Sequence, residues 1–260
     1  MLAINTRILM PDILASALAT DGLIWLVVAV FVAGLVRGFA GFGSAMIIMP
    51  VVSSILSPVE AVIFLICAEL VGPIPNTPAA WRDGTPRQVG LLVLGAVLAL
   101  PLGLWALTSM DPTAFGWVVS ISVSTLLVLT VSGWRLKGAL TQRLIVAAGA
   151  VGGFMTGFAG IPGPPVIMLY MASTLPVKTI RANFLLYLVG LDLILFPVLW
   201  AFGLMNWSIA FLGVLVGIPN LIANMIGARL FDPSAERLFR NVAYLVIAAS
   251  AIIGLPLWKG

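Results

Sequence analysis

Long apolar runs separated by short polar links divide this chain into eight hydrophobic stretches. They cover residues 22–56, 59–80, 88–109, 113–134, 143–172, 180–202, 207–230 and 240–258. A helix needs about 20 apolar residues to cross the hydrocarbon core of a bilayer, and helical backbone satisfies its own polar groups there. The pattern therefore predicts an all-α integral membrane protein with eight apolar segments and no soluble domain between them.

Composition supports a bilayer as the solvent. The chain is 62% hydrophobic and 8% charged, whereas soluble domains carry about 25% charged residues. The 13 Lys and Arg against 9 Asp and Glu lie mostly in the links, where they indicate topology and not nucleic-acid binding. We expect a multi-pass protein of a bacterial inner (plasma) membrane, in contact with lipid. Residues 1–21 are typical of an interfacial N-terminal segment and not of a cleaved signal peptide.

The two halves of the chain resemble each other. The tetrapeptide Gly-Phe-Ala-Gly at 38–41 recurs at 157–160, an offset of 119 residues. Further matches in nearly the same register pair Gly34 with Gly153, 47–49 with 166–168, 70–72 with 188–190, and 111–112 with 232–233. Small residues recur by chance where membrane helices pack, but several matches in register favour duplication. We predict a first transmembrane repeat at 1–138 and a second at 139–260.

The first stretch of each repeat is too long for one straight span and too rich in Gly and Pro to stay helical. The second repeat even contains the run Ile161-Pro162-Gly163-Pro164-Pro165. Backbone released from a helix inside a bilayer is tolerated only where protein or a water-filled cavity satisfies it. We therefore predict that the first segment of each repeat is broken or re-entrant.

Loop charges distinguish two topologies. Eight full crossings with the N-terminus inside place seven Lys and Arg inside and five outside. A hairpin at the start of each repeat, with the N-terminus outside, places ten inside and only Arg7 and Lys259 outside. The positive-inside rule favours the second arrangement. Three full crossings per repeat make the repeats inverted, so that the hairpin tips at 38–44 and 157–163 approach the midplane from opposite faces.

The motif Gly-Phe-Ala-Gly-Phe-Gly at 38–43, its apolar run ending at Pro50, and its recurrence resemble the TauE/SafE sulfite-exporter family. The segment Ile-Gly-Ala-Arg-Leu at 226–230 also looks like the second half of that family. Its members are described as exporters or importers of sulfite, sulfoacetate and related small anions. The resemblance implies a membrane transporter of such an anion. The proline-rich second motif departs from the family pattern, which leaves the substrate open.

A small anion crossing hydrocarbon needs donors that replace its hydration. Free amides at the starts of broken helices and a few polar side chains supply them. The candidate substrate-binding residues are Arg37, Gly41, Gly43, Ser44, Thr156, Gly160, Gly163, Asn76 and Asn183. The alternatives are helix packing for the glycines, an arginine that extends to the membrane interface, and helix-joining asparagines.

Acids inside a membrane segment are candidates for function by default. Glu69 and Asp192 flank the duplicated Leu-Val-Gly, and the chain contains no histidine. These two residues are therefore the candidate proton carriers, with a structural pairing to Arg37 or to backbone groups as the alternative.

These features favour a secondary transporter over a passive anion channel, which is the nearest alternative. Without histidine, a metal-ligand cluster or a nucleophile beside a base, the usual parts of an enzyme are missing. The sequence contains no Walker-type phosphate loop, so we do not expect ATP to drive transport directly. We expect no cofactor and no metal. The direction of transport, the coupling ion and assembly into a homo-oligomer stay open.

Overall fold

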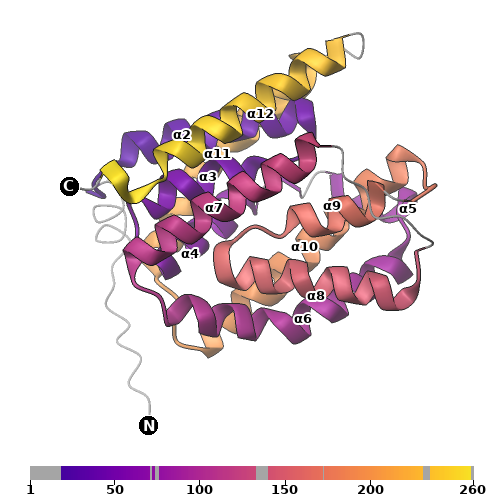
Figure 1. Cartoon of the computed structure of the whole chain (residues 1–260), viewed down its shortest axis with the longest axis horizontal. Coiled ribbons are helices and arrows are strands. Elements are labelled where there is room, and N and C mark those ends of the chain that lie inside the picture. Colours follow the sequence, from indigo (N-terminus) through magenta and orange to yellow (C-terminus); the bar gives the residue numbers. More distant parts are fainter. Residues whose placement is uncertain are drawn as a thin grey trace.

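The structure is a computed structural model that describes residues 19–70, 72–73, 76–132, 140–171, 173–230 and 235–258. All regular secondary structure in these ranges is helical (Figure 1). The first helices are α2 (Leu23–Ala40), α3 (Ser44–Ser53), α4 (Pro58–Glu69), α5 (Thr77–Asp83), α6 (Pro86–Thr108) and α7 (Pro112–Val131). The others are α8 (Gln142–Ala159), α9 (Gly163–Met171), α10 (Val177–Ala201), α11 (Trp207–Leu230), α12 (Glu236–Ile253) and the 3₁₀ turn Pro256–Trp258. Most of the predicted interfacial segment, and the match at 232–233, lie outside the described residues.

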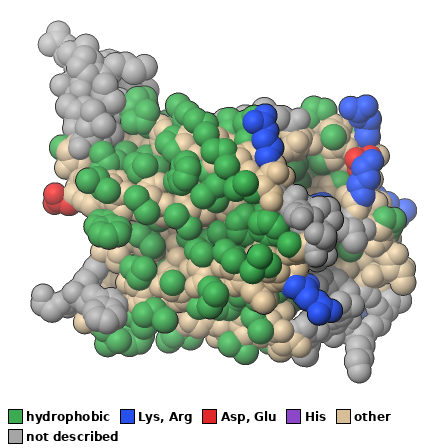
Figure 2. All heavy atoms as spheres, turned by 90° about the horizontal axis from the view of Figure 1, so that it is seen from above, with side chains coloured by type: hydrophobic (Ala, Val, Ile, Leu, Met, Phe, Trp, Pro, Cys, Tyr) green, Lys and Arg blue, Asp and Glu red, His purple; other side chains and the backbone are tan. Residues whose placement is uncertain are grey.

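Among the residues that the structure describes, five helices are long and apolar enough to cross a membrane. They are Leu23–Ala40, Pro86–Thr108, Pro112–Val131, Lys178–Ala201 and Trp207–Leu230. Their outer faces carry large exposed apolar side chains, such as Leu98, Trp105 and Leu193, and hydrophobic side chains spread over the surface in Figure 2. A water-soluble monomer does not expose so much continuous apolar surface. The chain is thus a multi-pass membrane protein, as its composition predicts.

Local sequence signals set the helix starts. Pro58, Pro86 and Pro112 stand in the first turn of their helices, where a missing amide hydrogen costs no hydrogen bond. Before α7, the Oδ1 atom of Asp111 accepts hydrogen bonds from the backbone N–H groups of Thr113 at 2.9 Å and Ala114 at 3.0 Å. Such caps satisfy amides that have no acceptor within the helix.

The first and fifth apolar stretches are each broken into two helices, at the glycine motifs. α2 ends at Gly41, which has a φ of 79°, and α8 ends at Gly160, which has a φ of 68°. Residues with a side chain rarely adopt this left-handed backbone conformation, whereas glycine adopts it freely. The helices therefore break where the sequence predicts.

The second stretch, predicted as one segment at 59–80, is also broken, and the prediction of a continuous segment was wrong. α4 ends at Glu69 and α5 begins only at Thr77. Pro73 and Pro75 lie between them and lack the amide hydrogens that a continuing helix needs. In the second half of the chain, α10 runs unbroken for 25 residues.

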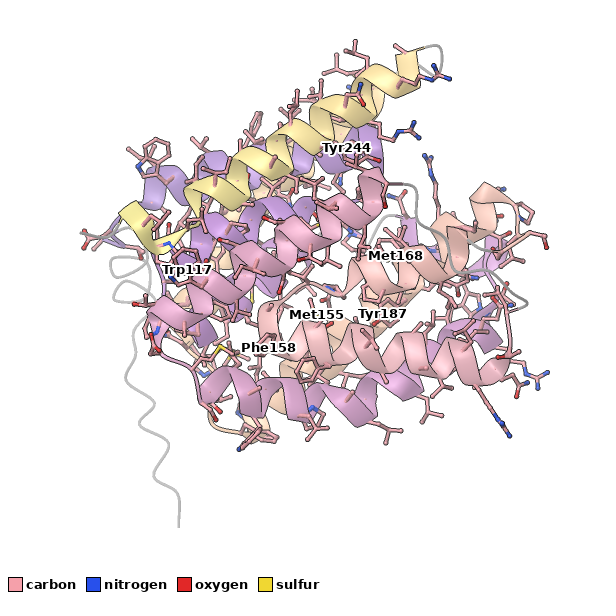
Figure 3. All side chains as sticks on the ribbon, in the orientation of Figure 1. Trp117, Met155, Phe158, Met168, Tyr187 and Tyr244 are labelled. Atoms are coloured by element: carbon pink, nitrogen blue, oxygen red, sulfur yellow. The ribbon has the colours of Figure 1, made fainter. Side chains whose placement is uncertain are left out.

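The two halves of the chain interlock through parallel pairs of helices. α6 lies along α8 (Figure 1) and α2 lies along α11. In the first pair, Gly153 lies against the backbone of Ala96, and Gly103 lies against the backbone of Phe158, labelled in Figure 3. No Cβ atom fits at these glycines. Small residues let membrane helices approach this closely, and the approach brings the two breaks together in the interior.

Candidate functional site

Two adjoining pockets lie between the helix breaks. The first, which we name the Ser44 pocket, is lined by Arg37, Phe42, Gly43, Ser44, Ala45, Met46, Glu69, Ile161, Pro162, Gly163, Ile167, Phe184 and Leu188. The second, the Asp192 pocket, is lined by Arg37, Leu65, Ile66, Glu69, Pro73, Thr156, Gly160, Pro162, Leu188, Leu191, Asp192 and Leu195. Arg37, Glu69, Pro162 and Leu188 line both pockets. These shared residues make the two pockets one candidate site.

An ion pair lies where the two pockets meet. An Nη atom of Arg37, in the last turn of α2, is 3.3 Å from Oε2 of Glu69, the last residue of α4. The two side chains are only 13% and 15% exposed. The second carboxylate oxygen of Glu69, Oε1, is buried without a hydrogen-bond partner. A buried acceptor without a donor is costly, so this oxygen can accept a hydrogen bond from a further donor.

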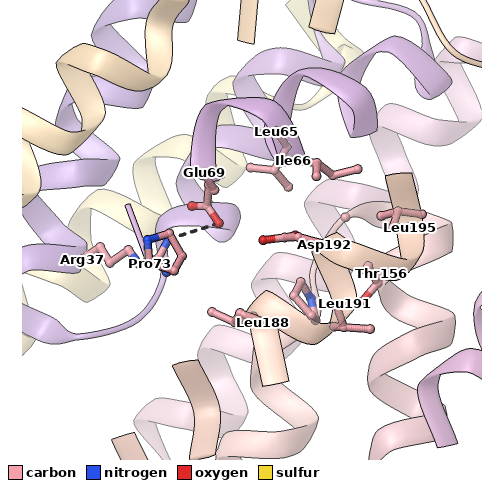
Figure 4. A pocket seen from close by; sticks show the side chains of 12 residues that line it. Arg37, Leu65, Ile66, Glu69, Pro73, Thr156, Leu188, Leu191, Asp192 and Leu195 are labelled. Atoms are coloured by element: carbon pink, nitrogen blue, oxygen red, sulfur yellow. Dashed lines mark ion pairs between the residues drawn. The ribbon is translucent and has the colours of Figure 1, made fainter. Parts of the chain in front are cut away.

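Asp192 faces this ion pair from α10. Figure 4 shows the carboxylates of Asp192 and Glu69 directed toward the same space. Asp192 is close enough to both Glu69 and Arg37 for an electrostatic interaction with each. The site thus combines one cation and two carboxyl groups, contributed by three helices.

Residues in the first turn of α3 line the Ser44 pocket. Gly43, with a φ of 94°, turns the chain into the helix. The first amide that bonds within the turn is that of Ile47, which donates to the carbonyl of Gly43 at 3.2 Å. The amides of Ser44, Ala45 and Met46 therefore have no acceptor within α3, and the helix dipole adds a partial positive charge.

The matching start of α9 offers fewer donors. Gly163 lines the Ser44 pocket, but it is followed by Pro164 and Pro165, which have no amide hydrogen. The sequence predicts free amides at both breaks. Because of these prolines, the second break can contribute only the amide of Gly163 and side chains further along the chain.

Thr156 and Gly160 lie on the Asp192 pocket. The hydroxyl of Thr156 is buried and donates to the carbonyl of Gly152 at 2.6 Å, so toward the pocket it offers lone pairs. Gly160 packs close to Leu65 and Met49. Its position at the break therefore combines a helix end with close packing.

Three of the predicted substrate-binding residues line neither pocket. Gly41 and Asn76 are exposed. Asn183 is buried, and its Oδ1 atom accepts a hydrogen bond from the amide of Thr85 at 2.6 Å. Its Nδ2 atom donates to Oε1 of Gln88 at 3.5 Å. Asn183 thus joins α10 to the start of α6, in line with the helix-joining alternative. Arg37 points inward and pairs with Glu69.

Sequence reasoning missed the apolar walls of the site. Phe42, Phe184 and Leu188 line the Ser44 pocket, but an apolar residue in an apolar segment carries no signal of its own. Arg181 is one of the ten cationic residues that the favoured topology places inside, and its sequence position indicates topology alone. It is exposed at the start of α10, and its Nε atom lies 3.9 Å from where a Cβ atom of Gly41 would stand. Its nearness to the first break could be found only from the packing of α10.

No group of three or more His, Cys, Asp or Glu side chains that could hold a metal ion occurs in the described parts of the chain. The polar groups that line the pockets are one guanidinium, backbone amides and hydroxyls, which can donate, and two carboxyl groups, which accept when ionised. Guanidinium and free amides are donors that suit an anion.

Comparison with known proteins identifies the family. Residues 26–253 match the family described as Sulfite exporter TauE/SafE. No curated protein and no solved structure matches the chain. The family match spans both helix breaks, both pockets and nearly the whole described fold. The chain therefore belongs to the TauE/SafE sulfite exporter family of membrane transporters.

Proposed function

We propose that this protein is a secondary transporter of a small sulfur-containing anion, a sulfur oxyanion or an organosulfonate such as sulfite or sulfoacetate, in a bacterial inner membrane. The observation that carries the proposal is the position of Arg37, whose side chain lines the same pocket as the first turn of α3. A guanidinium and free helix-start amides together match the oxygens of a sulfite or sulfonate group.

The anion would bind in the Ser44 pocket. Arg37 supplies the charge, and Ser44 adds a hydroxyl that is buried beside the free amides. Phe42, Phe184 and Leu188 supply an apolar wall that excludes water, which strengthens electrostatic attraction in the pocket. Gly43 and Gly163 let a ligand approach the backbone closely.

The proposal includes two inverted repeats, 1–138 and 139–260, each beginning with a re-entrant hairpin. Ile55, just after α3, packs against Gly22, just before α2, so both ends of the first pair of helices lie on one side. In the second repeat, Val146 near the start of α8 packs on Gly95 of α6. Asn183, near the start of α10, bonds to Thr85 at the beginning of α6. These contacts support a return of the second hairpin to its own starting side.

Charge distribution favours the same topology. In Figure 2 the Lys and Arg side chains gather toward the right-hand end, where α5 and the start of α12 lie in Figure 1. The exposed side chains Trp105, Trp117, Trp200 and Trp207 instead stand near helix ends that the proposed topology places outside. A cationic inner side and interfacial tryptophans are typical of bacterial membrane proteins.

Coupling to protons is part of the proposal, with Glu69 and Asp192 as the carriers. Both carboxyls line the Asp192 pocket. A carrier with alternating access moves one repeat against the other around such a site. A passive channel lined by the two opposed hairpins is the alternative. Saturable flux that depends on a proton gradient in proteoliposomes would distinguish the carrier from the channel.

The test of the anion assignment is thermal stabilisation of the purified protein by sulfite, thiosulfate, sulfoacetate, isethionate and simple carboxylates. We expect at least one sulfur oxyanion or sulfonate to raise the melting temperature in a saturable way. Stabilisation by uncharged solutes alone would contradict the proposal.

A further inference from the structure

The Arg37–Glu69 ion pair stands between the two pockets. Along α10, Phe184 lines only the Ser44 pocket, Leu188 lines both, and Asp192 lines only the Asp192 pocket. Because a helix rises about 1.5 Å per residue, the pockets succeed each other along the axis of α10. A solute that passes from one pocket to the other must therefore pass the ion pair.

The charges in the pocket walls do not balance. Arg37 is the one cation, and Glu69 and Asp192 are the two acids among the residues that line the pockets. With all three ionised, the net charge is +1 − 2 = −1. An anion that enters would make it more negative in a site of low dielectric, where uncompensated charge is costly.

Other titratable or charged groups around Glu69 lie off the pockets. Cys67 on α4 packs against Gly213 of α11, and Tyr187 on α10, labelled in Figure 3, lies beside Gly152 of α8. Arg181 is exposed. On the helices packed against α4, α3 carries no charged residue, Arg229 stands at the far end of α11, and Arg87 stands in the first turn of α6. None of them lines either pocket.

We propose that the anion and Glu69 exchange places on Arg37, and that each anion which binds takes up a proton with it. The anion enters the Ser44 pocket and forms the ion pair with Arg37. Glu69 is released from Arg37, and the Glu69–Asp192 pair binds one proton from the aqueous side. This inference rests on the proposed function and deepens it, because it makes the transporter an anion–proton symporter.

Two features support the exchange. The Arg37–Glu69 contact uses one carboxylate oxygen, and the other is buried without a partner, so a site for the proton already exists. Asp192 faces Glu69 across the pocket (Figure 4), and two facing carboxylates without a cation do not both stay ionised. The pair therefore holds a proton once Arg37 has turned to the anion, and the site keeps its net charge with a monoanion bound.

Proton uptake on anion binding tests the exchange. Purified protein in weakly buffered detergent solution near neutral pH is mixed with isethionate, thiosulfate or methanesulfonate, whose charge is constant there, and a pH indicator reports the protons. We expect uptake of about one proton for each sulfonate bound. Melting temperatures at several pH values should show affinity falling by up to about tenfold per pH unit as pH rises, because binding and protonation are linked.

Glu69→Gln tests the group that exchanges. Its amide cannot take the proton, so the variant should bind the sulfonate with a flatter pH profile and less proton uptake. Glu60→Gln is the matched control: it makes the same change on the same helix, where Glu60 accepts from Asn206 at 3.0 Å and lines neither pocket. Glu60→Gln should keep the proton uptake of the unmodified protein.

The outcomes separate this inference from the proposed function. Saturable stabilisation of the unmodified protein without proton uptake would overturn the exchange and leave anion transport standing. Wild-type uptake in both Glu69→Gln and Asp192→Asn would also overturn it. If no sulfur oxyanion or sulfonate stabilised the protein, both the exchange and the proposed function would fail. The measurements on the unmodified protein decide the matter even where a variant does not fold.

Discussion

The two helix breaks share a glycine cap and differ in chemistry. Residues 37 and 156, 41 and 160, and 44 and 163 stand 119 positions apart. At the first break, Gly41 donates its amide to the carbonyl of Arg37 at 2.8 Å; at the second, Gly160 donates to the carbonyl of Thr156 at 2.9 Å. Both glycines adopt the left-handed conformation. The same capping interaction therefore ends both helices.

The side chains at the two helix breaks differ. Arg37 carries a charge into the pockets, whereas Thr156 turns its hydroxyl hydrogen to Gly152 of its own helix. The first break continues into Ser44, Ala45 and Met46 with free amides, and the second into two prolines. The comparison teaches that two breaks with the same glycine cap need not offer the same chemistry, because the guanidinium and most of the helix-start amides belong to the first break.

Of the changes that test this difference between the breaks, removing the charge of Arg37 should have the largest effect on anion binding. We expect Arg37→Gln to weaken anion binding by about 100-fold, because a buried charge-assisted interaction is lost and Glu69 is left without its cation. Anion-dependent melting and flux in proteoliposomes measure the loss. Arg143→Gln, an exposed arginine at the start of α8, is the control and should bind normally. Equal loss in both variants would mean that Arg37 has no specific role.

Filling the helix contacts tests a feature that the two halves of the chain share. Gly34 lies against Asn220 and Ala223, and Gly153 lies against the backbone of Ala96. We expect Gly34→Ala and Gly153→Ala each to lower the free energy of unfolding by about 2 kcal/mol, because a Cβ atom must push helices apart. For Gly90→Ala, where nothing lies within 4 Å, thermal unfolding should show a change of no more than about 1 kcal/mol, toward stability. An undisturbed Gly153→Ala would contradict this account of the packing.

The two hydroxyls should give the smallest effects, and unequal ones. Ser44→Ala removes a group in the pocket that we assign to the anion and should weaken binding by about fivefold. Thr156→Val removes a hydroxyl whose hydrogen is already used within α8, so its effect on binding should stay within about twofold. Titration of both variants with the same sulfonate measures the difference. A greater loss in Thr156→Val would assign the anion to the Asp192 pocket.

Some features of the site could be found without the fold. The left-handed glycines Gly41 and Gly160 end their helices as the motif predicts, since capping depends on neighbouring residues. Arg37, Glu69 and Asp192 could be singled out because charges in apolar segments are rare. The sequence offered a pairing of these acids with Arg37 only as an alternative, because α2, α4 and α10 meet only through packing. Asn183 shows the opposite outcome. The sequence makes it a candidate for substrate binding, but it joins α10 to the start of α6, because a polar residue at an apolar position can equally join helices.

Family membership and the location in a membrane follow from the sequence, because hydrophobic length and glycine motifs are local properties of a chain in a bilayer. The breaks at the two glycine motifs follow for the same reason. Tertiary structure alone decided that the Glu69 carboxylate meets Arg37 and that Asp192 faces both. Those contacts join residues far apart in the sequence, and the approach of the helices that carry them is set by small residues at their crossings.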